Sequence, residues 1–194
     1  WSVPEKKVNY PYFSVIHIDG LVLTYPDVGE YMVAYDGLTG EKIRTYTKGS
    51  VFPTREKKKI DWGTEVLAEA AAGAGVLIQA VEKAVYALDI ATGELLWKYE
   101  SPNRYMNLPA IDTTNGQVYA VESETKVYFA RWPKVYAYDV LAFDLKTGAQ
   151  KWRSDVRKNS CISQIMASGD KVVLTSAQTY TDCTGKRNLG KEKN

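Results

Sequence analysis

The sequence contains little of the side-chain chemistry on which most catalytic sites depend. Its 194 residues include two cysteines and a single histidine. With His17 as the only histidine, no Ser-His-Asp or Cys-His arrangement can be argued from the sequence, and we expect His17 to be a hydrogen-bonded core residue. Cys161 and Cys183 lack metal-ligand spacing. They form either a disulfide, which would imply an oxidising compartment, or two ordinary thiols.

The sequence also lacks a large excess of charge of either sign and has no long apolar run. The formal net charge is +2, which lacks the basic excess of a nucleic-acid-binding surface. The basic run Arg55–Lys59 lies in a predicted linker, where a solvated loop is favoured over an anion site. The segment Leu67–Val81 includes Glu69 and two glycines and is shorter than the roughly 20 apolar residues of a membrane span. The sequence therefore predicts neither a nucleic-acid partner nor a membrane helix.

The sequence does contain a repeated unit, which is its strongest signal. Three stretches share it: Ala34–Arg44, Ala87–Trp97 and Ala142–Trp152. In each, an aspartate is followed three and four residues later by threonine and glycine, and the aspartates are 53 and 55 residues apart. Three copies with the same internal offsets indicate a structural repeat.

Each copy is predicted to form a strand, a turn and a second strand. The aspartate carboxylate accepts hydrogen bonds from backbone N–H groups two or three residues further on. The glycine adopts the positive φ that a longer hairpin loop requires. A metal-ligand or general-base role for Asp89 or Asp144 is the alternative, and it would require the same role in all three copies. The small alanine before each aspartate leaves room on one sheet face for a tryptophan from a neighbouring unit.

Further predicted strands flank each copy and extend it to a four-stranded repeat. The repeats cover approximately residues 12–48, 64–101 and 107–156, followed by an incomplete repeat at 160–194. Asp-Gly, Ala-Gly, Asn-Gly and Gly-Asp pairs separate the first and second strands of successive repeats, as expected for hairpins. Four short antiparallel strands in each repeat predict an all-β fold, a β-propeller of about three and a half blades.

These residues resemble the quinoprotein-like β-propeller family, known as the PQQ-like repeat. Its tryptophan-docking motif is Ala-x-Asp-x-x-Thr-Gly-x-x-x-Trp, and the resemblance extends from about residue 12 to residue 178. Two copies match it fully, at Ala87, Asp89, Thr92, Gly93 and Trp97 and at Ala142, Asp144, Thr147, Gly148 and Trp152. In the family this tryptophan packs between adjacent blades. Arg44 departs from the motif, which leaves one such contact open.

Three and a half repeats are fewer than the four to eight blades that close most propeller rings. We therefore expect the sequence to be an internal piece of a longer propeller. The alternative is a half-ring that pairs with another chain. In either case the expected partners are a second protein or the remaining blades.

The interval Glu122–Asp139 is longer than a plain turn between the second and third strands, and it is aromatic and basic. Insertions of this kind form loops at one rim of a propeller and often carry binding. Arg131, Trp132 and Tyr136 are therefore the candidate contacts to a ligand or partner. The alternative is an insertion that only packs on its own blade.

The resemblance also implies two functions. Dehydrogenases of the family hold pyrroloquinoline quinone (PQQ) and calcium near the axis, with a vicinal cysteine pair that is absent here. Four carboxylates lie outside the docking turns without matching that site, so no catalytic residue is assigned: Asp61, Asp112, Asp139 and Asp182. We predict a non-catalytic binding or scaffold module for a protein or small ligand, as in the outer-membrane assembly lipoproteins of the superfamily, outside the cytoplasm. The alternative is part of a PQQ- and calcium-dependent dehydrogenase.

Overall fold

Fourteen β-strands and no helix make up the part of the chain that the computed structural model describes. The described residues are 15–24, 32–46, 69–81, 83–102, 104–123, 135–155, 161–169 and 171–176. Within them there is no helix long and apolar enough to cross a membrane.

The first two sheets are antiparallel meanders of four strands each. The first consists of β1 (Ile16–Ile18), β2 (Leu21–Thr24), β3 (Met32–Asp36) and β4 (Lys42–Tyr46). The second consists of β5 (Glu69–Gly73), β6 (Val76–Val81), β7 (Ala84–Asp89) and β8 (Leu95–Glu100). Spatial order follows sequence order in both, so each strand pairs with the next one along the chain.

The third sheet repeats this meander, and a further hairpin follows it. The third contains β9 (Tyr105–Asp112), β10 (Gln117–Ser123), β11 (Val135–Asp144) and β12 (Gln150–Asp155). The hairpin consists of β13 (Cys161–Ser168) and β14 (Lys171–Ser176). Val135 and Tyr136 at the start of β11 pair with β13, which links the hairpin to the third sheet.

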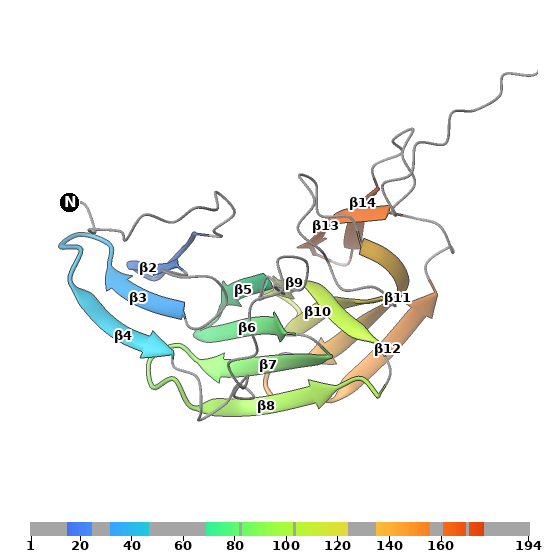
Figure 1. Cartoon of the computed structure of the whole chain (residues 1–194), viewed down its shortest axis with the longest axis horizontal. Coiled ribbons are helices and arrows are strands. Elements are labelled where there is room, and N and C mark those ends of the chain that lie inside the picture. Colours follow the sequence, from blue (N-terminus) through green and yellow to red (C-terminus); the bar gives the residue numbers. More distant parts are fainter. Residues whose placement is uncertain are drawn as a thin grey trace, which may run out of the picture.

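The sheets stand side by side in an open arc (Figure 1). Their first strands are neighbours, since β1 contacts β5, β5 contacts β9, and β9 contacts β13. The last strands β4, β8 and β12 run along the outside of the arc (Figure 1). This is the predicted all-β architecture of stacked four-stranded blades, seen as a partial ring.

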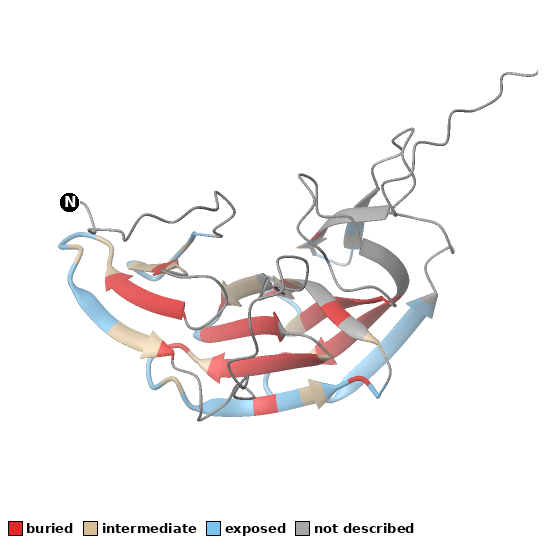
Figure 2. Ribbon diagram, viewed as in Figure 1, coloured by how far each residue is buried: buried red, intermediate tan, exposed pale blue. Residues whose placement is uncertain are grey.

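Apolar side chains fill the spaces between consecutive sheets. Leu23 and Met32 of the first sheet pack with Leu77 and Leu88 of the second. The middle strands are buried on both faces, as the unbroken burial of residues 84–88 shows, because a neighbouring sheet covers each face. Figure 2 shows this distribution, with buried middle strands and an exposed outer edge.

Two tight turns explain how the first two strands of a sheet are joined. Asp19 and Gly20 have φ of 49° and 77°, and Ala74 and Gly75 have φ of 50° and 76°. Positive φ at both central residues is the geometry of a two-residue hairpin turn whose twist matches that of the strands. The Asp-Gly and Ala-Gly pairs of the sequence therefore mark hairpins, as predicted.

Two expectations from the sequence need correction. His17 is exposed on β1 and is not a core residue, because Ile16 and Ile18 on either side of it point towards the second sheet. The predicted insertion is also shorter than 122–139, since β10 continues to Ser123 and β11 begins at Val135. The start of β11 lies within the expected insertion because the backbone of Val135 and Tyr136 pairs with β13 and that of Ala137 pairs with β10.

Candidate functional site

The three Asp-x-x-Thr-Gly turns have nearly the same geometry. The Oδ1 atom of Asp36 accepts hydrogen bonds from the backbone N–H groups of Leu38 and Thr39 at 2.9 and 2.7 Å. Asp144 accepts the equivalent pair from Lys146 and Thr147, both at 3.0 Å. These bonds stabilise the ionised carboxylate, and the pKa of Asp36 is lowered chiefly by its bond from the Thr39 backbone.

The Asp89 turn of the second sheet follows the same pattern, and its carboxylate also accepts a backbone hydrogen bond. Asp89 accepts a hydrogen bond from the Thr92 N–H at 2.6 Å. Its pKa is also lowered, first by that bond. Among the described residues, no three His, Cys, Asp or Glu side chains gather as a metal site. Each aspartate therefore accepts hydrogen bonds within its own turn.

Asp144 gives a pH-dependent prediction. Lys151 Nζ lies 3.0 Å from its Oδ2, and this contact, with the Thr147 bonds, lowers the pKa from 3.8 to about 2. A carboxyl with a depressed folded-state pKa contributes stability above its unfolded pKa and loses it as pH falls through the folded value. We expect urea midpoints of the wild type to fall between about pH 4 and pH 2, and those of Asp144→Asn to fall less. Equal slopes for the two proteins would contradict this.

The indole of Trp97 joins the second sheet to the turn of the third. Its Nε1–H donates to the backbone oxygen of Leu145 at 2.8 Å, and the side chain is 7% exposed. Gly148, with φ +70°, lies directly beneath the ring, where a Cβ would approach Trp97 Cδ2 to 2.6 Å. The ring also lies 6.0 Å from that of Phe143. The motif glycine here has a second role, which is to leave room for the indole.

Two glycines provide a matched test of this role. Gly93 occupies the same turn position with φ +76°, and a Cβ there would come no closer than 3.5 Å to Arg44. An alanine at either site is strained by about 1–2 kcal/mol in the left-handed conformation. Gly148→Ala should lose about 1–3 kcal/mol more than Gly93→Ala, because it also displaces the indole. Urea unfolding measures both, and equal losses would show that the indole does not depend on Gly148.

Arg44 and Tyr46 together join the first sheet to the second. Arg44 Nη1 donates to the backbone oxygen of Thr92 at 2.7 Å, and Tyr46 Oη donates to that of Ile90 at 2.7 Å. Ile90 follows its motif aspartate as Leu145 follows Asp144, so the acceptor carbonyl is equivalent in the two joints. The contact that the sequence left open at Arg44 is therefore made, by two side chains in place of one indole.

Trp152 stands in a different environment from Trp97. Its side chain is 38% exposed, and its ring lies 5.7 Å from Tyr119 of its own sheet. Of the predicted partner contacts, Arg131 and Trp132 lie outside the described residues, as does Cys183. Tyr136 is placed only by its backbone, which pairs with Cys161.

An ion network of two buried carboxylates and two partly exposed arginines joins β10 and β11, the strands on either side of residues 124–134. Glu122 near the end of β10 and Asp139 of β11 are register partners, and they are 2% and 5% exposed. Arg104, between β8 and β9, places Nη1 3.1 Å from Asp139 Oδ2 and 3.4 Å from Glu122 Oε2. Arg153 of β12 donates from Nε to Asp139 Oδ2 at 2.6 Å and pairs with Glu122 through Nη2.

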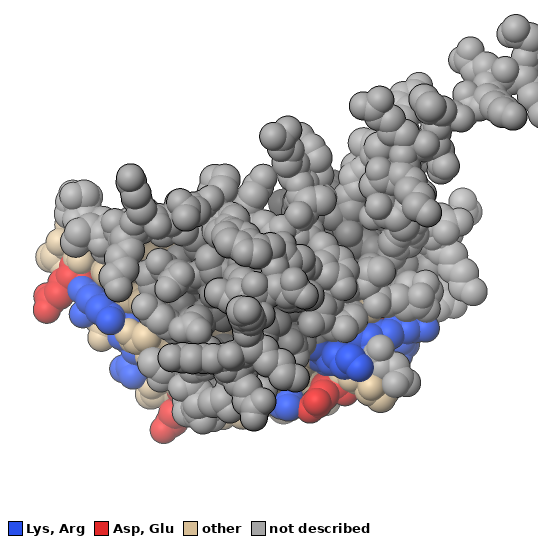
Figure 3. Space-filling model, viewed as in Figure 1, with Lys and Arg blue, Asp and Glu red and all other residues tan. Residues whose placement is uncertain are grey.

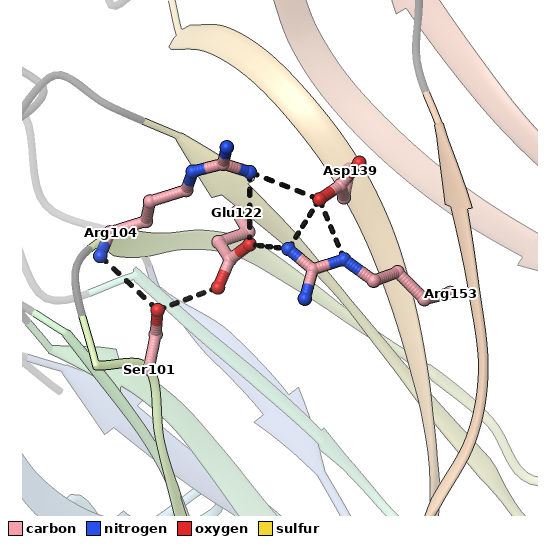
Figure 4. Close-up of polar contacts among 5 residues, drawn as sticks. All are labelled: Ser101, Arg104, Glu122, Asp139 and Arg153. Atoms are coloured by element: carbon pink, nitrogen blue, oxygen red, sulfur yellow. Dashed lines mark hydrogen bonds and ion pairs between the residues drawn. The ribbon is translucent and has the colours of Figure 1, made fainter.

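Figure 4 shows the two guanidinium groups approaching the carboxylates from opposite sides. Two carboxylates held side by side on neighbouring strands repel each other, and two cations neutralise that repulsion. The pKa of Arg153 is raised, first by its hydrogen bond to Asp139, so this side chain stays charged. Ser101 adds a donor, with Oγ 2.6 Å from Glu122 Oε1. The network thus ties the chain after β8 to β10, β11 and β12.

Every second residue from Trp97 to Ser101, on and just after β8, contacts the third sheet. Trp97 bonds to Leu145 at one end, the rings of Tyr99 and Phe143 are 4.7 Å apart in the middle, and Ser101 bonds to Glu122 at the other. The joint between these sheets is therefore closed at both rims. The sequence alone leaves Asp139 as an unassigned carboxylate, because no local motif points to its partners.

Comparison with known proteins places this geometry in a family. Residues 28–187 match the PQQ-like repeat family described as outer membrane protein assembly factor BamB. The chain belongs to this family. The match covers most of the chain, and it confirms the resemblance that the docking motifs carried. None of the curated protein sequences matches at a significant level.

Solved structures match the chain at low identity and agree on the propeller fold. The designed protein Ika8 matches at 15% identity and TM-score 0.59, over 84% of this chain and 42% of its own. The Pan2 WD40 domain of Neurospora crassa matches at 8% and 0.55, over 84% and 42%. Quinohemoprotein alcohol dehydrogenase from Comamonas testosteroni matches at 20% and 0.51, over 73% and 20%. The chain spans less than half of each, and the likeness concerns the fold.

Proposed function

We propose that this chain is a non-catalytic, protein-binding part of a β-propeller, and that its partner binds at the rim where β10 ends and β11 begins. The observation that carries the proposal is the buried network of Glu122, Asp139, Arg104 and Arg153. It joins Glu122, next to the last residue of β10, to Asp139, which lies four residues after the start of β11. A loop with a fixed base loses less conformational entropy when it binds.

The segment itself has the composition of a contact surface. Arg131 and Trp132 belong to the residue types that dominate binding energy at protein interfaces, and Tyr136 is the second residue of the adjoining strand β11. Both guanidinium groups of the network are engaged by carboxylates at the same rim, which supports a structural role for them. The family description names an assembly factor of the outer membrane. We therefore propose a protein component of outer membrane assembly as the partner and an extracytoplasmic location.

Site-specific photo-crosslinking tests the proposal. A photoreactive phenylalanine analogue replaces Trp132 in one variant and Leu38 in the other, and both are expressed in the natural host. Leu38 is the matched control, because it is 91% exposed on a docking turn at the opposite rim. We expect a defined protein adduct at position 132, absent at position 38 and weakened by Arg131→Glu.

Two results would contradict the proposal. One is an adduct of equal yield at both rims, which would mean that the chain binds other proteins non-specifically. The other is an adduct at position 38 alone, which would move the binding site to the docking turns.

A further inference from the structure

An asparagine side chain joins the third sheet to the hairpin that follows it. Asn115 lies in the turn between β9 and β10, and its Nδ2 donates to the backbone oxygen of Gly169 in the turn between β13 and β14. The same nitrogen donates to Asp112 Oδ2 at 2.7 Å. Both acceptors are oxygens, so this contact requires the two N–H donors of an amide group.

The turn around Asn115 is organised by Asp112. Its Oδ1 accepts the backbone N–H groups of Thr114 and Asn115 at 3.0 and 3.1 Å, as in an Asx turn. Gly116 ends the turn with φ +61°, and its carbonyl accepts the Leu145 N–H at 2.9 Å. The pKa of Asp112 is lowered, first by the hydrogen bond from the Asn115 side chain, so a carboxylate faces the amide.

The equivalent turns of the first and second sheets have no such amide. Their central pairs are Asp19-Gly20 and Ala74-Gly75, and the glycine carbonyl of each accepts the equivalent backbone hydrogen bond. The repeat is therefore built without an asparagine at this position. The pair at 115–116 is the one Asn-Gly sequence in the chain, and it lies where two turns meet.

An Asn-Gly pair reacts with itself in water, because glycine has no Cβ to hinder its backbone nitrogen. In this reaction the glycine nitrogen attacks Cγ of the asparagine and forms a succinimide ring. The Cγ–Nδ2 bond breaks, and Nδ2 leaves as ammonia with the proton of the glycine N–H. Water then opens the ring at either carbonyl and leaves aspartate or isoaspartate. Asn115 is exposed to this water, and a Cβ added at Gly116 would meet no residue beyond its chain neighbours within 4 Å.

The product cannot make the contacts of the amide. A carboxylate has no N–H donor, so the hydrogen bonds from position 115 to Asp112 and Gly169 are both lost. Two like charges would also face each other where Asn115 Nδ2 and Asp112 Oδ2 are now 2.7 Å apart. The hairpin keeps its apolar packing through Ile165 and its pairing with β11, so it is loosened without being unfolded.

The cations of β12 do not offset this repulsion. Figure 3 shows Lys and Arg side chains gathered over β12. Lys151 is paired with Asp144, and Arg153 is hydrogen-bonded to Asp139. In the sheet, β11 lies between β12 and β10. These charges are already balanced within the third sheet, so they leave the repulsion at position 115 in place.

We propose that Asn115 is a self-modification site, at which attack by the Gly116 nitrogen replaces the amide with a carboxylate and loosens the β13–β14 hairpin on the third sheet. The folded structure controls the rate, because the hydrogen bonds to Asp112 and Gly169 hold the amide in place. The modified fraction therefore records how often the hairpin has opened. The site lies apart from the 124–134 segment and does not depend on the function proposed above.

Peptide mapping tests the modification. The purified chain is incubated in mildly alkaline buffer and digested with trypsin beside an unincubated sample, which releases residues 105–126 as one peptide. Asn107, which is followed by leucine, is the internal control in that peptide. We expect the mass gain of deamidation to accumulate at Asn115, as a mixture of aspartate and isoaspartate, with Asn107 unchanged. Gly116→Ala should lose most of this reaction, because its methyl group hinders the nitrogen.

Hydrogen exchange and one packing variant test the coupling to the hairpin. Ile165→Ala weakens the packing of the hairpin away from the turn and should speed the modification of Asn115. Asn115→Asp, which imitates the product, should exchange the amides of β13 and β14 about tenfold faster than wild type, as expected for the loss of ordinary hydrogen bonds. Thr114→Asp is the matched control, because it adds the same charge to the same turn and keeps the amide.

Three results would overturn the proposal. Asn115 could remain unmodified in the chain under conditions that modify a synthetic peptide of residues 105–126. Ile165→Ala could leave the rate of modification unchanged. Asn115→Asp and Thr114→Asp could alter the exchange of β13 and β14 to the same extent, which would show that the amide does not hold the hairpin.

Discussion

Replacing Trp97 with alanine is expected to lower the free energy of unfolding by about 3–5 kcal/mol, as for other large buried aromatic residues. The indole is 7% exposed and lies between the second and third sheets. Its loss removes the packing on Gly148 and Phe143 together with the hydrogen bond to Leu145. Urea unfolding followed by circular dichroism measures the change.

Two further variants separate the contributions of the indole. Trp97→Phe keeps much of the packing and loses the hydrogen bond, so a loss smaller than that of the alanine variant is expected. Trp152→Ala serves as the control, because the same motif position is 38% exposed there and a loss below about 1 kcal/mol is expected. A loss under about 1 kcal/mol for Trp97→Ala would show that the indole does not hold the two sheets together.

The second large effect is expected from the ion network. Removing both cations, in the double variant Arg104→Ala and Arg153→Ala, leaves two carboxylates that are 2% and 5% exposed without their cationic partners. Breaking a buried charge pair from one side costs about 3–5 kcal/mol, because an uncompensated charge remains.

Neutralising the carboxylates is the matched control for this variant. Adding Glu122→Gln and Asp139→Asn to the double variant removes the uncompensated charges and should recover a large part of the lost stability. Such recovery identifies charge as the cause, since the arginine side chains stay absent. A quadruple variant no more stable than the double variant would mean that the arginines act through packing alone.

The docking motif explains why the turns and strands of this protein are readable in the sequence. The Asp36, Asp89 and Asp144 turns are closed by hydrogen bonds within a few residues of each aspartate. The spacing of residues in the motif is therefore enough to predict each turn. Hairpin turns such as Ala74-Gly75 are equally local. Repetition then supplies the order of the strands, because each unit folds onto the one before it.

The ion network shows what such spacing cannot reveal. Glu122 meets Asp139 only through the register of β10 on β11. Arg104 and Arg153 come from opposite edges of the third sheet, one just before β9 and the other on β12. The replacement of an indole by Arg44 and Tyr46 is similar, because the sequence shows the departure from the motif but not the carbonyls that accept the new hydrogen bonds. The strand pattern around His17 is similarly ambiguous, because the neighbouring isoleucines, and not the histidine, face the core.

The predicted contact residues remain a prediction of the sequence. Arg131 and Trp132 were chosen because an aromatic and basic stretch interrupts an otherwise regular repeat. The structure contributes the base of that stretch, in the network that joins β10 to β11. The structure also places Leu38 at the opposite rim, which supplies the control position for the crosslinking experiment.

Our proposal that this propeller segment binds a protein predicts that it does not bind a redox cofactor. The most direct test is a titration of the purified chain with PQQ, with and without calcium, followed by tryptophan fluorescence. The account predicts no saturable quenching and no effect of calcium. Saturable, calcium-dependent binding would contradict it and would favour the quinoprotein dehydrogenase alternative.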